Sequence, residues 1–151
     1  MAGDKIACPT WFFMKVLMTR LIPILLALSC CFAAFGRSVW EGIYTKEQAS
    51  RGQAVYREEC AKCHGENLGG GESSPALAGA DFLSNWNGKS VGDMLERIIA
   101  TMPADDPGNL ARRQYADITA YVLSANEFPA GAKDLDSTPA TLKDVAIEAK
   151  K

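Results

Sequence analysis

Apolar residues recur at helical spacing along most of the chain beyond its N-terminal segment. Thr45, with Gln48 three residues later, has the features of a helix N-cap, and Ala49, Gly52 and Tyr56 then fall on one face. We find no internal repeat, no low-complexity tract and no alternating pattern typical of strands. The first predicted element is therefore a helix that begins at Thr45 and runs toward Cys60.

Two further helices are predicted downstream. Ser90 and Asp93 open a helix that Pro103 ends, and its apolar stripe follows the i, i+3, i+4, i+7 spacing: Val91, Met94, Leu95, Ile98, Ile99 and Met102. A last helix is predicted from about Leu110 to Asn126, before Pro129, with one face formed by Ala111, Tyr115, Ile118, Val122 and Ala125. The pattern indicates an all-α domain.

Segments without a strong pattern lie between and after these helices. Residues 65–79, "GENLGGGESSPALAG", are rich in glycine and are predicted to form a loop. Residues 130–151 have only a weak apolar pattern, for which we expect a loosely docked helix or a frayed tail.

The N-terminal segment, residues 1–36, has the pattern of a signal peptide. Fifteen uncharged residues, 21–35, follow a basic stretch, and Ala34 and Gly36 supply small residues for cleavage after Gly36. Translation could instead start at Met14 or Met18. Fifteen residues are fewer than the ~20 that span a bilayer. Two alternatives are an uncleaved anchor and a weak lipid-attachment site at Cys30, so membrane anchoring stays open; otherwise we expect export, to the periplasm in a bacterium, with no membrane span after cleavage.

Removal of this segment changes both charge and cysteine content. The remaining chain has 13 Lys and Arg against 17 Asp and Glu, a net charge of −4, which disfavours nucleic acid as a partner. Only Cys60 and Cys63 remain of five cysteines, so an exported protein with this sequence has no disulfide framework.

The motif "CAKCH" contains both of these cysteines and the only histidine, His64. A redox dithiol of the thioredoxin type would sit at a helix N-terminus in a βαβ framework, and a structural zinc site would need a fourth ligand. Covalent haem needs what is present, namely two thiols for the two porphyrin vinyl groups and a histidine for the iron. We interpret C-x-x-C-H as the attachment site of one haem c.

Met102 is the candidate for the second axial ligand of the iron. Only Met94 and Met102 remain beyond the signal peptide, and Met94 lies within the helical stripe, where packing is its expected role. Met102 also continues that stripe, which leaves a core role possible. Pro103, however, ends the helix and frees the thioether to turn toward a metal.

Beyond Gly36 the chain resembles the class I monohaem cytochromes c, and in particular the small bacterial cytochrome domains that partner quinoprotein dehydrogenases. The resemblance rests on "CAKCHG" at 60–65, "PALAG" at 75–79, "WNGKSVGDMLERIIATMP" at 86–103 and "YADITAYVLSANEFP" at 115–129. It implies a cytochrome c fold of three to five helices wrapped around one haem.

The resemblance also implies roles for individual residues. Pro75 would offer its carbonyl to the His64 ring, Leu77 would line the haem pocket, and Trp86 would border the haem edge or a propionate. Gly52 and Tyr56 would meet Tyr121 where the first and last helices cross. A plain loop proline and an ordinary core tryptophan are equally good readings of Pro75 and Trp86.

The functional prediction is an exported electron carrier with no catalytic activity of its own. A lead-in at 37–44 precedes the cytochrome domain at 45–129, and 130–151 form a C-terminal extension. One electron would pass between a dehydrogenase or reductase donor and an oxidase or other terminal acceptor through iron bound by His64 and Met102. The alternatives are a haem sensor or peroxidase-like protein with an open sixth position, and a haem-free redox dithiol.

Overall fold

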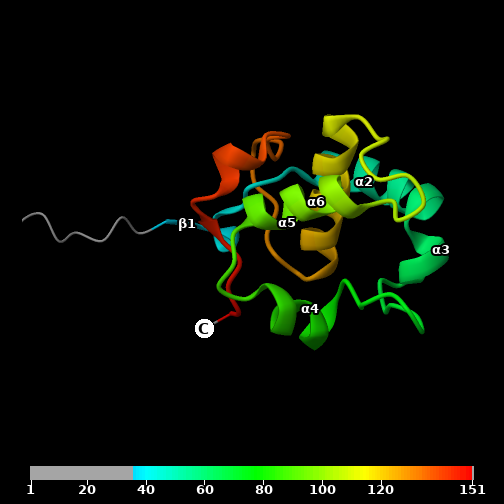
Figure 1. The fold of residues 1–151 in the computed structure, drawn as a ribbon. Coiled ribbons are helices and arrows are strands. Elements are labelled where there is room, and N and C mark those ends of the chain that lie inside the picture. The colour runs from blue at the N-terminus through cyan, green and yellow to red at the C-terminus, as the bar shows by residue number, and fades with distance from the viewer. Residues whose placement is uncertain (1–35, 151) are drawn as a thin grey trace, which may run out of the picture. The chain divides into compact units, whose positions relative to one another are not determined.

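The computed structural model describes residues 36–150, and helices make up most of its regular structure (Figure 1). In chain order the elements are β1 (Arg37–Ser38), the 3-10 turn η1 (Val39–Glu41), α2 (Lys46–Glu59), α3 (Ala61–His64), α4 (Gly79–Trp86), α5 (Val91–Thr101), α6 (Arg112–Ala125), the 3-10 turn η2 (Pro139–Leu142) and β2 (Val145–Ala146). The predicted all-α class is confirmed. The predicted signal peptide, with Met14, Met18 and Cys30, lies outside the described residues except for Gly36.

Helix α2 begins where the sequence predicts. The Thr45 hydroxyl accepts a hydrogen bond from the Gln48 backbone N–H at 3.1 Å, which satisfies one of the free donors at the helix start. The helix ends at Glu59, and Cys60 donates its N–H to the Tyr56 carbonyl at 2.8 Å before the short helix α3 follows. The cysteine motif is thus attached directly to the end of α2.

Helices α2 and α6 cross at Gly52, which has no room for a side chain. A Cβ at this position would lie 1.8 Å from the Asp117 carbonyl oxygen on α6, far inside van der Waals contact. Beside this crossing, the Tyr56 and Tyr121 rings pack with their centroids 5.2 Å apart. The close approach of the two backbones therefore depends on glycine, as the small-plus-aromatic set predicts.

Helix α5 has caps at both ends. Ser90 and Asp93 form a reciprocal capping box, with Asp93 N–H donating to the Ser90 hydroxyl at 2.9 Å. The helix ends at Thr101, and Met102 is extended, with φ −129° and ψ 151°. Met102 has therefore left the helical path, one residue earlier than the sequence pattern predicts.

Two predictions about helices need correction. Helix α4 was not predicted, since Ala78 gives it no side-chain cap and it spans only eight residues, yet it buries Phe82. Helix α6 is shorter at both ends than the predicted 110–126, and Ala111 and Ala125 are exposed instead of lying on its buried face.

The prediction that residues 130–151 form a loosely docked helix or a frayed tail is wrong. The segment contains η2 and β2, and β2 pairs in parallel with β1, Arg37 opposite Val145 and Ser38 opposite Ala146. Its side chains Leu135, Leu142, Val145 and Ile147 are at most 4% exposed. Lead-in and extension thus pack together and complete the core (Figure 1).

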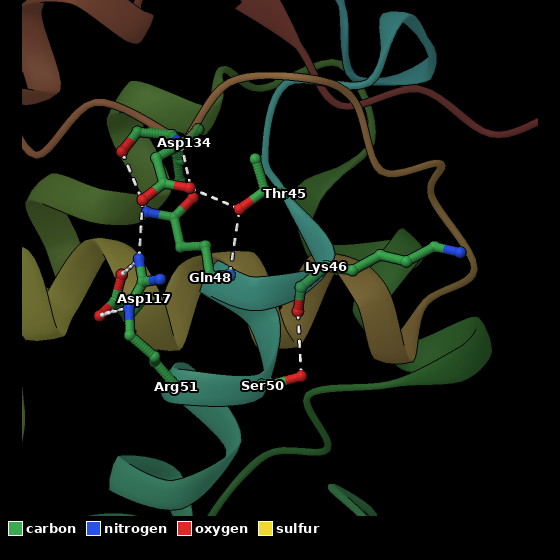
Figure 2. A network of polar contacts seen from close by, with 8 residues as sticks. Thr45, Lys46, Gln48, Ser50, Arg51, Asp117 and Asp134 are labelled. Atoms are coloured by element: carbon green, nitrogen blue, oxygen red, sulfur yellow. Dashed lines mark hydrogen bonds and ion pairs between the residues drawn. The ribbon is translucent and has the colours of Figure 1, made fainter.

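Polar contacts fasten the extension to α2 and α6 (Figure 2). The Gln48 side chain, 2% exposed, makes two hydrogen bonds with the Leu135 backbone. The Arg51 guanidinium forms ion pairs with Asp117 of α6 at 3.1 Å and with Asp134 at 2.7 Å. The Thr45 hydroxyl donates a hydrogen bond to Asp134. These contacts link segments more than 60 residues apart, which is why no local pattern predicts them.

Candidate haem site

The two cysteines and the histidine lie on a single turn, with Cys63 and His64 in helix α3 and Cys60 as its N-cap. Both thiols are free; Cys60 is half-buried and Cys63 is exposed. His64 is 7% exposed. The turn therefore presents one thiol at the surface, a second below it and an imidazole inside.

The environment of Cys60 does not suit a redox dithiol. Burial, together with the adjacent Glu59 carboxylate, raises the pKa of the Cys60 thiol to about 11. A reactive dithiol needs the opposite shift, because the thiolate is the attacking species. Cys60 therefore lacks the low pKa typical of the attacking thiol in a redox dithiol.

The orientation of the His64 ring is fixed by the following loop. Its Nδ1 lies 2.9 Å from the Pro75 carbonyl oxygen, eleven residues further along. Because a carbonyl can only accept a hydrogen bond, Nδ1 must carry the proton, and Nε2 keeps its lone pair for a metal. The loop is itself closed by hydrogen bonds from Gly70 N–H to the His64 carbonyl and from Leu77 N–H to the Leu68 carbonyl.

Tyr56 also contacts the motif, through its hydroxyl. The ring is fully buried, and the hydroxyl donates to the Gly65 carbonyl at 2.8 Å. Burial raises the pKa of this hydroxyl, so it stays protonated and remains a donor. Tyr56 thereby ties α2 to the residue after His64.

Met94 and Met102 occupy different environments. Met94 is 2% exposed within α5, whereas Met102 is half-buried just beyond the helix end. An ion pair of 2.6 Å between Lys62 Nζ of α3 and Asp105 Oδ2 links the loop after Met102 to α3. Of the two methionines, Met102 thus belongs to the segment that reaches the cysteine motif.

A comparison with protein families supports this reading of the site. The family described as "Cytochrome C oxidase, cbb3-type, subunit III" matches residues 47–122, half of the chain. The chain belongs to this cytochrome c family. It is a class I monohaem cytochrome c-like protein, and membership implies covalently bound haem c and an electron-carrier role.

A solved structure shows the same fold. This cytochrome superposes on a chain of the sulfane dehydrogenase SoxCD from Paracoccus pantotrophus with a TM-score of 0.51 and 24% identity, over 65% of its own length. The match covers 52% of that protein's chain, about half its length. No curated protein matched the cytochrome.

The domain offers both apolar side chains and a donor set that suit an apolar ring bearing an iron. Several apolar side chains are only half-buried although they pack against the core: Leu77, Trp86, Ile98, Ile99 and Leu110. An apolar macrocycle packed against such side chains would bury more of their surface. Imidazole Nε2, two thiols and a thioether are also the donor set that haem c takes. Within residues 36–150, no three His, Cys, Asp or Glu side chains gather as ligands for another kind of metal site.

Leu77 and Trp86 remain predicted pocket residues. Leu77 is half-buried in the loop that carries Pro75, and its carbonyl accepts from the Asn126 side chain at 2.9 Å. Trp86, the last residue of α4, is half-buried, and Lys89 Nζ lies 5.2 Å from its ring centroid.

Asn126 is a residue that the sequence analysis missed. Its side chain bonds the Leu77 carbonyl, the Val122 carbonyl and the Gly79 N–H at 2.8 to 2.9 Å. It thus ends α6 and anchors the loop that orients His64. An asparagine just after a predicted helix indicates a C-cap, but nothing local indicates its partners 47 to 49 residues earlier.

Proposed function

We propose that this cytochrome is an exported single-haem electron carrier. In this proposal Cys60 and Cys63 form the two thioether links, and His64 and Met102 bind the iron. Haem supplies the one-electron couple between ferrous and ferric iron. The protein's part is to fix the two ligands, exclude water and leave an edge accessible for electron transfer.

One observation carries the proposal: Pro75 fixes the His64 ring with Nε2 free, on the helical turn whose Lys62 pairs with Asp105, three residues after Met102. The carbonyl contact sets the tautomer and increases the basicity of the imidazole. The ion pair between Lys62 and Asp105 links the loop after Met102 to the helix that ends at His64. In this proposal one iron takes its nitrogen donor from His64 and its sulfur donor from Met102.

Two bound ligands leave no open position for a substrate, so we expect no catalysis by the cytochrome alone. A methionine ligand favours ferrous iron and raises the midpoint potential, which suits a carrier that accepts electrons from a dehydrogenase or reductase. Because Cys63 is exposed, the porphyrin edge attached to it would face solvent. Electrons would leave there, during brief contacts of small area with an oxidase or another acceptor.

The proposed location is the periplasm or another exported compartment. The charge pattern of residues 1–36 supports export. Among residues 36–150, no helix is long and apolar enough to cross a membrane. Anchoring through an uncleaved leader or a lipid at Cys30 would hold the same domain at a membrane surface.

Spectra of the purified full-length protein test this function. We expect a low-spin ferric spectrum, no carbon monoxide adduct of the ferrous protein at low gas pressure, and porphyrin that stays with the polypeptide after acid-acetone extraction. A high-spin spectrum with ready carbon monoxide binding would instead support a sensor or peroxidase-like protein. A colourless protein would support the dithiol.

A further inference from the structure

Tyr115, in the first turn of α6, makes a hydrogen bond that the proposed electron transfer does not explain. Its side chain is fully buried, and its hydroxyl donates to the Met102 carbonyl at 2.8 Å. The same hydroxyl lies 3.4 Å from the Leu110 N–H, which donates to it. The hydroxyl of this buried tyrosine thus donates its only hydrogen bond to the main chain of the candidate ligand.

The main chain of Met102 is held from both sides. Its N–H donates to the Ile98 carbonyl at 2.9 Å, which fixes it to the end of α5. Its carbonyl accepts from Tyr115 and, at 3.3 Å, from the Gly108 N–H. Because Met102 is extended where α5 would otherwise continue, these two acceptor contacts hold its carbonyl away from the helical path.

Within residues 36–150, no hydrogen bond reaches the side chain of Met102. A thioether is a weak acceptor with no proton to donate, so the protein can aim it only through the backbone and through packing. Tyr115 is the contact that fixes this backbone from another helix. Replacing Tyr115 by phenylalanine would remove the hydroxyl and release the Met102 carbonyl. It would open no cavity, because the phenylalanine ring fills the same volume.

We propose that Tyr115 is a positioning residue for the iron's sixth ligand. It holds the Met102 backbone so that the thioether stays aimed inward, and it thereby limits the entry of competing ligands at the iron. This inference rests on the proposed function, specifically on ligation by Met102.

The test compares Tyr115→Phe with Tyr44→Phe in the holoprotein. Tyr44 is the matched control, since it is 2% exposed and its hydroxyl also donates to a backbone carbonyl, that of Phe128. Each variant loses one hydroxyl from a buried ring. Imidazole, which competes with methionine for ferric iron, is titrated while the loss of the sulfur-to-iron charge-transfer band is recorded; unfolding by urea is followed separately.

We expect the apparent imidazole affinity to rise about fivefold in Tyr115→Phe, the factor that corresponds to one lost hydrogen bond. In Tyr44→Phe the affinity should change by less than about twofold, because that site shares no partner with Met102. Both variants should unfold at a similar, lower urea concentration.

Equal imidazole affinities in the two variants would overturn the positioning role of Tyr115. So would failure of Tyr115→Phe to fold when Tyr44→Phe folds, because Tyr115 would then be a general core residue. Met102→Ala distinguishes a failure of the positioning role from a failure of the proposed function. If that variant keeps the wild-type band and imidazole affinity, ligation by Met102 is wrong, whatever Tyr115 does.

Discussion

The two candidate axial ligands are held by different means. On the side of His64, the Pro75 carbonyl bonds the imidazole itself, at 2.9 Å. On the side of Met102, the hydrogen bonds within the described part of the chain all reach its backbone, through Ile98, Tyr115 and Gly108. The histidine is thus held at the donor group, and the methionine only at its main chain.

This difference follows from the chemistry of the two side chains. An imidazole has two nitrogens, and a hydrogen bond to one of them decides which nitrogen is free for a metal. A thioether has no proton to place, so only its position can be controlled. We therefore expect the methionine side to give way first when the protein is perturbed.

Gly52→Ala disrupts the crossing of α2 and α6, on which both ligand sides depend. It has the largest expected effect. A Cβ would lie 1.8 Å from the Asp117 carbonyl oxygen, so α2 and α6 must separate. We expect a loss of more than about 3 kcal/mol in the free energy of unfolding by urea, or no stable holoprotein. Gly88→Ala is the control, because φ is +80° there but no atom lies within 4 Å of the added carbon; it should cost about 1–2 kcal/mol. Equal losses would show that the crossing tolerates a side chain.

Asn126→Ala acts on the histidine side alone. It removes two hydrogen bonds that anchor the loop of Leu77 and Gly79 to the end of α6, and a third to the Val122 carbonyl within α6. Urea unfolding should show a loss of about 1–3 kcal/mol, while the imidazole affinity of the ferric iron should stay at the wild-type value. Asn85→Ala, an exposed asparagine with one bond to Asp81 O, should cost under about 1 kcal/mol. A rise in imidazole affinity in Asn126→Ala would mean that the two sides are not independent.

Acid should lower the stability of the protein slightly on the methionine side, because Asp93 caps the start of α5. Bonds from Lys143 and then from Ser90 lower the pKa of this carboxyl to about 2, from an ordinary 3.8. The folded-state pKa is the lower one, so the stabilisation is present above about pH 4 and is lost as the pH falls toward 2. Because the Asp93 side chain is 48% exposed, solvent screening should keep this stabilisation below about 1 kcal/mol. Stability of the wild type and of Asp93→Asn, measured from pH 5 to pH 2, should converge over this window; a constant difference would contradict the assignment.

The sequence predicts those parts of the fold whose contacts are local. The caps at Thr45 and at Ser90 with Asp93 are readable because each bond joins residues three apart. The crossing at Gly52 can be predicted from the sequence because the set of Gly52, Tyr56 and Tyr121 accompanies the C-x-x-C-H motif. The departure of Met102 from the helix follows from Pro103.

The rest depends on contacts that no local pattern encodes. Residues 130–151 have a weak pattern because their order comes from pairing with β1 and from the Gln48 and Arg51 contacts. The polar roles of Tyr115 and Asn126 are hidden for the same reason. Tyr115 reads as one more apolar residue of the last helix, although its hydroxyl reaches a residue thirteen positions earlier.

The central claim is that Met102, and not Met94, completes the iron's coordination. The most direct test is the sulfur-to-iron charge-transfer band of the ferric holoprotein in Met102→Ala, with Met94→Ala as the matched control. We expect Met102→Ala to abolish the band. Met94→Ala should keep it and lose about 2–5 kcal/mol of stability, because Met94 is buried in the core. A band that is lost in Met94→Ala, or that survives both substitutions, would contradict this assignment of the sixth ligand.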